Sequence, residues 1–360
     1  MRTFTKREAD ICKGIAICMM LFHHLFNDYE EYAGFTVIYA PFSGERITFF
    51  ALVLKICVAI FVFISGYGLA ATYSRQFANK QKTKSEVAQF VWSKYWKLMT
   101  TYWFAFAITL LCQPLGRTIF DAYGNNIKEI ILYMFIDIMG LADLFSTPTL
   151  NPTWWYMSMA IAIIVIIPFI MYLVEKFTAI MVLVLFVILT QGNALNSVLN
   201  FYLFSVVLGV VSYETRLFDK INQIGKRSRF KFGLTVLVEV FLLLVLLSLR
   251  TNYNFNGIVD GLLALDLAVL VCAVVGKIPL VSKGLKLLGE NSANIFLLHN
   301  QLYSFYFLAF FYSFKYWFLI FGVLTGVSLI VSYGVDWLKN KIGYAKMMVN
   351  IGKAIENKII

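Results

Sequence analysis

Long uninterrupted apolar runs are the feature that most limits how this 360-residue chain can fold. The runs at residues 47–73 and 154–174 both exceed the roughly 18 residues that an α-helix needs to cross the hydrocarbon core of a bilayer. Hydrophobic residues make up 60% of the chain and charged residues only 14%, which is too little polar surface for a water-soluble domain. The sequence therefore predicts an all-α membrane protein, a bundle of membrane-spanning helices.

We expect about ten transmembrane helices in one membrane domain that covers residues 1–337. Their expected positions are residues 11–27, 47–73, 98–113, 154–174, 178–191, 199–215, 232–249, 258–275, 288–311 and 316–337. The remaining residues, 338–360, alternate lysines with Ile and Met, which is typical of a helix lying on the anionic cytoplasmic leaflet. Membrane lipids are therefore expected partners of both parts.

The distribution of positive charge predicts the orientation of the spans. The net charge is +11, yet 25 of the 31 Lys and Arg residues fall in segments that this arrangement places inside, and only five fall in outer segments. This is the positive-inside bias of membrane proteins rather than a basic face for nucleic acid. We expect cytoplasmic N- and C-termini and no nucleic-acid partner.

Residues 127–145 are also apolar, but we do not expect them to span. An eleventh span would move the basic cluster at residues 216–231 to the outer side, against the charge bias. The segment also contains Asp137 and Asp143, and a carboxylate is costly at the bilayer centre unless protein or water surrounds it. The sequence predicts a helix packed or re-entrant at the outer face.

All three histidines of the chain, His23, His24 and His299, lie in or beside apolar spans. Lys13 and His24 are eleven residues apart, which is about three helical turns, so they share a helix face about 16 Å apart along the axis. A coenzyme A thioester has this shape, with a charged head at the cytoplasmic face and a reactive thioester deeper in the membrane. His24 could then take a proton from an acceptor hydroxyl, or it could only cap the bundle by binding backbone at the interface.

Several other polar and aromatic side chains have both a functional and an ordinary interpretation. Lys94 and Lys97 share a helix face at the cytoplasmic start of a span, where they could bind phosphates or simply follow the positive-inside bias. An aromatic belt at the membrane interface is the ordinary interpretation of the aromatic run Trp154, Trp155 and Tyr156.

A metal site is not expected from this sequence. His23 and His24 diverge on a helix, and zinc needs further ligands at suitable spacing. Glu290 and His299 are two and a half turns apart and should point to opposite faces. The cysteines lie in or beside apolar runs without metal-ligand spacing, and we interpret them as small apolar residues: Cys12, Cys18, Cys57, Cys112 and Cys272.

These motifs, in this order, resemble those of the acyltransferase 3 family of integral membrane proteins. The stretch from Arg7 through Asp10 and Lys13 to His24 resembles the opening motif of the family, in which a basic residue precedes a histidine by eleven positions. The resemblance continues to about residue 335, through Phe61-Val-Phe-Ile-Ser-Gly-Tyr67, Lys94-x-x-Lys97, Trp154-Trp-Tyr-Met157, Leu288-Gly-Glu-Asn-Ser292 and Phe296-Leu-Leu-His299. The basic pair is often arginine in the family, and lysine lacks the bidentate fork for phosphate.

The resemblance implies transfer of an acyl group, usually acetyl, from cytoplasmic acetyl-CoA to a hydroxyl of an exported or cell-surface glycan, free or lipid-linked. His24 would be the catalytic base, and Lys13, Lys94 and Lys97 would bind the donor. Acceptor binding or structural support would fall to Asp10, Trp154, Trp155, Tyr156, Glu290 and His299. The resemblance implies a bacterial cytoplasmic membrane, no permanently bound cofactor, and either direct transfer or completion by a separate extracytoplasmic transferase.

A carrier or flippase for a lipid-linked glycan is the alternative from a different class of protein. It would use the same basic inner face and aromatic outer residues. The register of Lys13 with His24, which a flippase does not need, and the lack of pseudo-repeated halves favour the enzyme.

Overall fold

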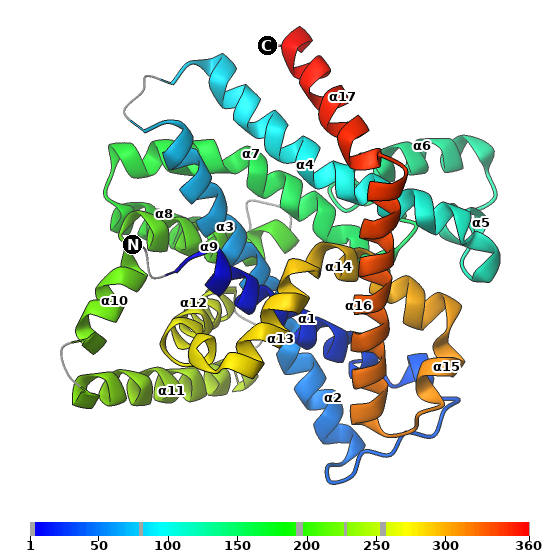
Figure 1. Cartoon of the computed structure of the whole chain (residues 1–360), viewed down its shortest axis with the longest axis horizontal. Coiled ribbons are helices and arrows are strands. Elements are labelled where there is room, and N and C mark those ends of the chain that lie inside the picture. The colour runs from blue at the N-terminus through cyan, green and yellow to red at the C-terminus, as the bar shows by residue number, and fades with distance from the viewer. Residues whose placement is uncertain (1–3, 79–81, 192–196, 227–228, 253–256, 360) are drawn as a thin grey trace. The chain divides into compact units, whose positions relative to one another are not determined.

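The computed structural model describes residues 4–78, 82–191, 197–226, 229–252 and 257–359 (Figure 1). Within these ranges the chain is helical, and the only strand-like pairing is the single bridge between Ile38 and Tyr316, which confirms the all-α prediction. The chain forms two compact units, each built from several segments. Unit 1 comprises Met1–Met20, Val53–Gln81 and Val165–Glu290, and unit 2 comprises Leu21–Leu52, Lys82–Ile164 and Asn291–Ile360.

Unit 1 contains most of the long apolar helices. It begins with the larger part of α1 (Lys6–Phe26) and ends with α13 (Pro279–Glu290). Between them lie α3 (Cys57–Gln76), the second half of α7 (Trp155–Lys176), α8 (Ala179–Gln191), α9 (Ser197–Glu214), α10 (Leu217–Lys226), α11 (Arg229–Asn252) and α12 (Gly257–Ala273).

Glycines bring the backbones of α3 and α9 into direct contact. A side chain at Gly66 would collide with the carbonyl of Val206, and one at Gly209 would collide with the carbonyl of Phe63. Small residues let membrane helices approach closely enough for backbone packing. Of the two glycines in Ser65-Gly-Tyr-Gly68, Gly66 allows this close approach, whereas Gly68 faces open space.

The first half of α1 is fixed to α13 by the same kind of contact. A side chain at Gly14 would meet the carbonyl of Leu285, and one at Gly289 would meet the carbonyl of Asp10. Arg7 adds polar bonds, because its guanidinium donates to the carbonyl of Gly276 at 2.6 Å. The start of the Lys13 to His24 face is thereby held in unit 1.

Arg250, one of the few cations that the sequence places in an outer segment, is not a solvated charge. Its guanidinium nitrogen Nε lies 2.6 Å from a carboxylate oxygen of Asp260, and both side chains are at most 2% exposed. A buried ion pair joins α11 to α12, and removing one partner would leave the other charge buried without compensation.

Unit 2 contains the end of α1 and a set of shorter helices around the long helix α4 (Lys84–Leu111). Thr83 and Glu86 form a capping box that begins α4. The other helices are α2 (Gly44–Val53), α5 (Ile119–Tyr123), α6 (Ile127–Ile138), the first half of α7, α14 (Ser292–Asn300), a π-helical turn η6 (Gln301–Tyr306), α15 (Leu308–Tyr312), α16 (Trp317–Lys341) and α17 (Tyr344–Ile359).

Residues 344–359, in the basic tail, form α17, which packs on α4. The indole nitrogen of Trp96 donates to the carbonyl of Met348 at 2.8 Å, and the hydroxyl of Tyr344 donates to the carbonyl of Thr100 at 2.8 Å. Met348 is buried against this contact, whereas Lys346 is exposed. The tail thus buries Met348 while Lys346 and Lys353 stay exposed.

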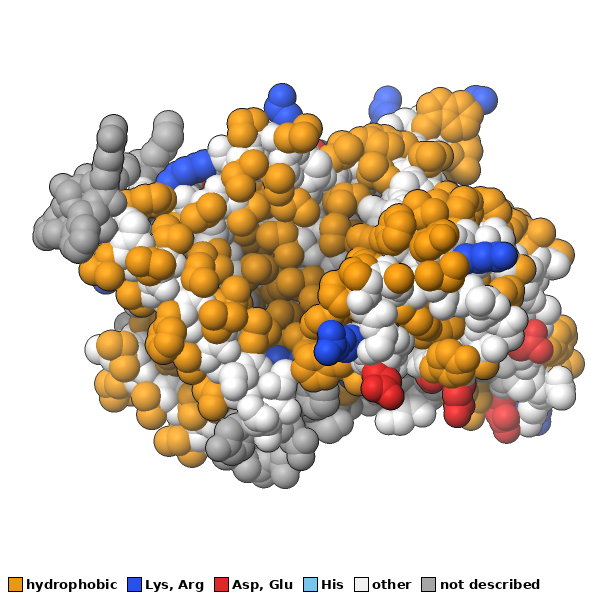
Figure 2. Space-filling model, turned by 90° about the horizontal axis from the view of Figure 1, so that it is seen from below, with side chains coloured by type: hydrophobic (Ala, Val, Ile, Leu, Met, Phe, Trp, Pro, Cys, Tyr) orange, Lys and Arg blue, Asp and Glu red, His pale blue; other side chains and the backbone are white. Residues whose placement is uncertain are grey.

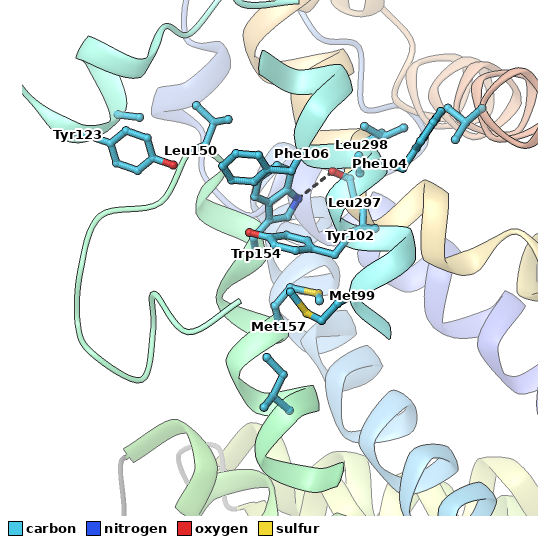
Figure 3. Packing of buried hydrophobic residues seen from close by; sticks show 14 of the residues in the cluster. Met99, Tyr102, Phe104, Phe106, Tyr123, Leu150, Trp154, Met157, Leu297 and Leu298 are labelled. Atoms are coloured by element: carbon cyan, nitrogen blue, oxygen red, sulfur yellow. Dashed lines mark hydrogen bonds between the residues drawn. The ribbon is translucent and has the colours of Figure 1, made fainter. Parts of the chain in front are cut away.

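A cluster of buried aromatic and aliphatic residues forms a core in unit 2, shown in Figure 3. Trp154 lies between Tyr102 and Phe106 of α4, with ring centroids 5.0 and 5.5 Å away. Its indole nitrogen donates to the carbonyl of Leu297 at 2.9 Å. Trp154 is 2% exposed, so it belongs to the core rather than to an interfacial aromatic belt.

Six helical stretches of the described chain are long and apolar enough to cross a membrane: Lys6–Phe26, Gly44–Gln76, Pro152–Lys176, Phe232–Asn252, Gly257–Lys277 and Trp317–Lys341. A seventh results if Val198–Glu214 and Leu217–Gln223, bent by 59°, form one span. Figure 2 shows apolar side chains over most of the described surface in its view. Only 6% of the apolar window in α11 is buried, so its exposed Leu237 and Phe241 suit a lipid environment.

Three of the ten expected spans do not appear as long apolar helices. Residues 98–113 are the end of α4, which begins at Lys84 with a polar half, and residues 178–191 correspond to the short helix α8. The expected continuous helix 288–311 is wrong, because the chain breaks at Asn291 and changes to a π-helical turn at Gln301. Asn291 accepts a hydrogen bond from Ser332 of α16, so the break docks α14 on that helix.

The orientation of the spans predicts the result of a labelling experiment. Residues 127–145 form the 12-residue helix α6 and turns, and α6 is not among the long apolar helices. If this segment does not span, the exposed Lys220 of α10 lies in the cytoplasm. In a variant whose five cysteines are replaced, Lys220→Cys should resist impermeant thiol reagents in intact cells and react after permeabilisation.

A cysteine at Lys315, in a predicted outer segment, is the matched control and should react in intact cells. Labelling of the cysteine at position 220 from outside would contradict the orientation. The basic cluster behind this prediction also includes Arg227, which lies outside the described residues.

Candidate active site

The end of α1 presents His24 within unit 2. His24 is half-buried, and its ring centroid lies 5.1 Å from that of His299. Tyr303 and Tyr312 donate hydrogen bonds to the carbonyls of His24 and Leu25 at 3.1 and 2.7 Å. The last carbonyls of a helix have no partner within it, so these hydroxyls complete the C-terminus of α1 and fix the backbone of His24.

Hydrogen bonding determines which nitrogen of His299 carries the proton. Its Nδ1 lies 2.8 Å from the carbonyl of Phe296 and 3.1 Å from that of Ile295, and a carbonyl can only accept. Nδ1 is therefore protonated, and in the neutral ring Nε2 is an unprotonated acceptor. The side chain is fully buried, and Nε2 has no hydrogen-bond partner among the described residues. A buried acceptor beside His24 is available to a bound hydroxyl or water.

His23 points away from this arrangement, as its 100° offset on the helix predicts. Its Nδ1 lies 2.8 Å from the carbonyl of Ala51 in α2, and the side chain is 8% exposed. His23 therefore joins α1 to α2, and its role is structural packing.

The segment before α7 fixes α14, the helix that carries His299. Asn151 is fully buried and accepts a hydrogen bond from the amide of Asn300 at 3.0 Å. Tyr156 packs edge to face on Phe296 at 5.4 Å, and Phe296 lies beside the ring of His299. The structure thus brings the aromatic run and His299 together, while Trp155 contacts Tyr156 at 6.0 Å.

Asp137 in α6 fixes the same segment from its other side. The carboxylate accepts four hydrogen bonds: from the hydroxyls of Tyr102, Tyr123 and Thr149 at 2.9, 2.7 and 3.0 Å and from the amide of Leu150 at 2.7 Å. Asp137 is 1% exposed. Of the two surroundings expected for an acid in this segment, protein or water, Asp137 has protein. Its carboxylate ties three helices to the loop before Asn151.

The Lys13 end of the Lys13 to His24 face lies in unit 1. Helix α1 is unbroken from Lys6 to Phe26, so the eleven-residue spacing keeps both side chains on one helix face. The Lys13 ammonium lies 3.2 Å from the carboxylate of Asp10, which is 4% exposed, whereas the lysine side chain is 34% exposed. Asp10 orients Lys13 and leaves donor capacity on the ammonium for a further anion.

Lys94 and Lys97 lie in the middle of α4 rather than at its start, because the helix begins at Lys84. The Lys94 ammonium sits over the ring of Phe90, 5.1 Å from its centroid, and Lys97 is exposed. Both belong to unit 2, whereas Lys13 belongs to unit 1. Glu290, also in unit 1, pairs with Lys286 at 2.9 Å, so its partner is a neighbour on α13.

Sequence reasoning did not single out Asn151, Asn300, Gln301 or Arg117 as functional residues. Asn and Gln in apolar runs give no periodic signal. Asn151 and Asn300 bind each other although they are about 150 residues apart in the sequence. The one available signal was the polar interruption Asn300-Gln301 directly after His299 in an otherwise apolar stretch.

Several long apolar helices define a multi-pass membrane protein, in which the rings of His24 and His299 lie side by side. The sequence model of the acyltransferase domain of the family Acyl_transf_3 matches residues 6–337. The chain belongs to this family and is a membrane acyltransferase, as the motif resemblance predicted. No curated protein and no solved structure matches the chain.

Proposed function

We propose that this acyltransferase moves an acetyl group from cytoplasmic acetyl-CoA to a hydroxyl of an exported or cell-surface glycan, free or lipid-linked, in the cytoplasmic membrane of a bacterium. The proposal rests on the position of His24. This residue is half-buried at the end of α1, shares a helix face with Lys13 and lies beside His299. This arrangement supports a donor whose charged head and reactive thioester are far apart.

In the proposed reaction His24 takes the proton of the acceptor hydroxyl as the oxygen attacks the thioester carbonyl. The carbon–oxygen bond forms, the carbon–sulfur bond breaks, and the imidazolium returns the proton to the leaving thiolate of coenzyme A. The unprotonated Nε2 of His299 is suited to orient the hydroxyl or the His24 ring. Direct transfer needs nothing else, whereas a separate extracytoplasmic transferase would take the acetyl group from this protein.

Deletion of the gene tests the function. Envelope glycans of the deletion strain should lose O-acetyl groups while the glycan itself still reaches the surface, and the intact chain should restore the acetyl groups. Loss of the glycan from the surface with its acetylation unchanged would instead support the flippase alternative.

The lysines proposed for the donor site are expected to affect binding more than turnover. Contacts to the phosphates of acetyl-CoA are alike in the ground and transition states, so their loss raises KM with little change in kcat. A charge-assisted hydrogen bond corresponds to roughly a tenfold change in KM. Initial rates over a range of acetyl-CoA concentrations should show a raised KM and a nearly unchanged kcat for Lys13→Gln, Lys94→Ala and Lys97→Ala.

Lys346→Ala is the control, because it removes an exposed lysine of the tail. Glutamine is chosen at Lys13 so that Asp10 keeps a hydrogen-bond donor nearby. An unchanged KM in all three variants would remove these lysines from the donor site.

A further inference from the structure

The chain changes helical register directly after His299. Residues Gln301–Tyr306 form a π-helical turn, with hydrogen bonds between residues five apart, and such turns are frequent at functional sites. Two side chains of residues 299–306 are directed to His24. The ring of His299 contacts the ring of His24, and the hydroxyl of Tyr303 donates to its carbonyl. Gln301 and Tyr306 are five residues apart, so the π-helical register places them together on another side.

This second side carries polar atoms without partners. Gln301 is 2% exposed, and neither its amide nitrogen nor its amide oxygen has a hydrogen-bond partner among the described residues. The hydroxyl of Tyr306 is likewise buried and unpaired within the described chain. Burying an amide without hydrogen bonds is costly, and native structures rarely do so unless a ligand or water supplies them.

A half-buried arginine lies beside Phe305, the residue before Tyr306. A side chain at Gly116 would come within 2.6 Å of the carbonyl of Phe305 and 2.7 Å of the Tyr306 ring, so the loop before α5 touches the π-helical turn directly. The next residue, Arg117, places its guanidinium 5.5 Å from the centroid of the Phe305 ring. Within the described chain its one hydrogen bond is a long one, 3.4 Å, to the carbonyl of Leu150.

The acids nearest to Arg117 are already engaged. Asp121 accepts hydrogen bonds from the amide and hydroxyl of Thr118 in the capping box of α5, at 2.9 and 2.8 Å. The carboxylate of Asp137 accepts its four hydrogen bonds from other groups. Burial lowers the pKa of Arg117, and neighbouring Tyr123, Asp121 and Asp137 only partly oppose this effect. The ion pairs of the described chain do not include Arg117.

We propose that Arg117, Gln301 and Tyr306 form an acceptor subsite that binds a sugar unit carrying an oxyanion, a carboxylate or a phosphate. The guanidinium fork matches the oxyanion, and the amide offers both a donor and an acceptor to sugar hydroxyls. The eight residues 299–306 rise only about 10 Å, so one short stretch orients His24 and binds the glycan. This inference rests on the proposed transfer to a glycan and specifies the chemical class of that glycan.

The test uses the full chain in detergent, radiolabelled acetyl-CoA and three soluble acceptors: methyl β-glucuronide, glucose 1-phosphate and the neutral methyl β-glucoside. The wild type should accept at least one anionic probe with a KM about tenfold or more below that of the neutral one. The better of the two anionic probes identifies the carboxylate or the phosphate. Arg117→Gln should raise that KM roughly 10–100-fold and leave the KM of acetyl-CoA and of the neutral probe unchanged.

Two further variants separate binding from folding. Lys128→Gln removes an exposed cation from the same unit and should keep the preference of the wild type. Gln301→Leu keeps the volume but removes the unpaired amide, so it should raise the KM of all three probes without lowering the melting temperature.

Equal KM values for the three probes in the wild type would overturn the subsite. So would a preference that survives Arg117→Gln, a melting temperature lowered by Gln301→Leu with unchanged KM values, or rejection of all three probes by a protein that still acetylates the endogenous glycan. A wild type that acetylates nothing, the endogenous glycan included, would contradict the proposed function itself.

Discussion

Replacing His24 by Asn or Gln should reduce acetyl transfer by about 10²–10⁴-fold, which is the usual contribution of a positioned general base. Each amide keeps hydrogen-bonding capacity near one of the two ring nitrogens, but neither can take a proton at neutral pH. If His24 only capped the bundle, one of the two amides should preserve most of the activity. The half-buried ring, 5.1 Å from His299, leads us to expect that both lose it.

The measurement is acetyl transfer to the envelope glycan by membranes that contain equal amounts of each variant. His23→Ala is an unsuitable control, because it would remove the bond to Ala51 from a buried residue. His23→Asn retains a donor near that carbonyl and should keep most of the activity. Active His24 variants together with an inactive His23→Asn would move the catalytic face of α1.

The apolar runs predict the long helices because a helix that faces lipid must be a long run of apolar residues. Residues 47–73 and 232–249, for example, appear as Gly44–Gln76 and Phe232–Asn252. The break in the expected span 288–311 has no such signal. It depends on Ser332 binding Asn291 and on the register change at Gln301, both properties of the packed state.

The candidate site likewise has features that the sequence predicts and features that depend on packing. The sequence identifies His24 and His299 individually, because ionisable groups are rare inside membranes. It could not predict their proximity, since they are 275 positions apart and helix periodicity relates only near neighbours. Spacing related His299 only to Glu290, whose partner is Lys286 on its own helix. The sequence thus identifies candidate side chains, whereas tertiary packing determines which of them lie close together.

Removing the carboxylate of Asp137 should destabilise the protein by on the order of 3–5 kcal/mol, because each buried donor that loses its acceptor costs roughly 1–3 kcal/mol. Asp137→Ala leaves the hydroxyl of Tyr123 and the amide of Leu150 buried without their acceptor, whereas the hydroxyl of Tyr102 keeps the backbone carbonyl at position 137. Asp137→Asn should cost less, roughly 1–3 kcal/mol, because one oxygen remains while the new amide group faces donors. Thermal unfolding of purified protein in detergent measures both changes.

The same variants connect stability to the site. The amide of Leu150 precedes Asn151, which binds Asn300 next to His299, so a loosened loop should also lower transfer at temperatures where the protein remains folded. Asp143→Asn is the matched control, because it changes the same residue type on a half-exposed side chain six positions later and should stay within about 0.5 kcal/mol. Equal melting temperatures for Asp137→Ala and Asp143→Asn would show that the four hydrogen bonds to Asp137 do not hold the loop before α7 in place.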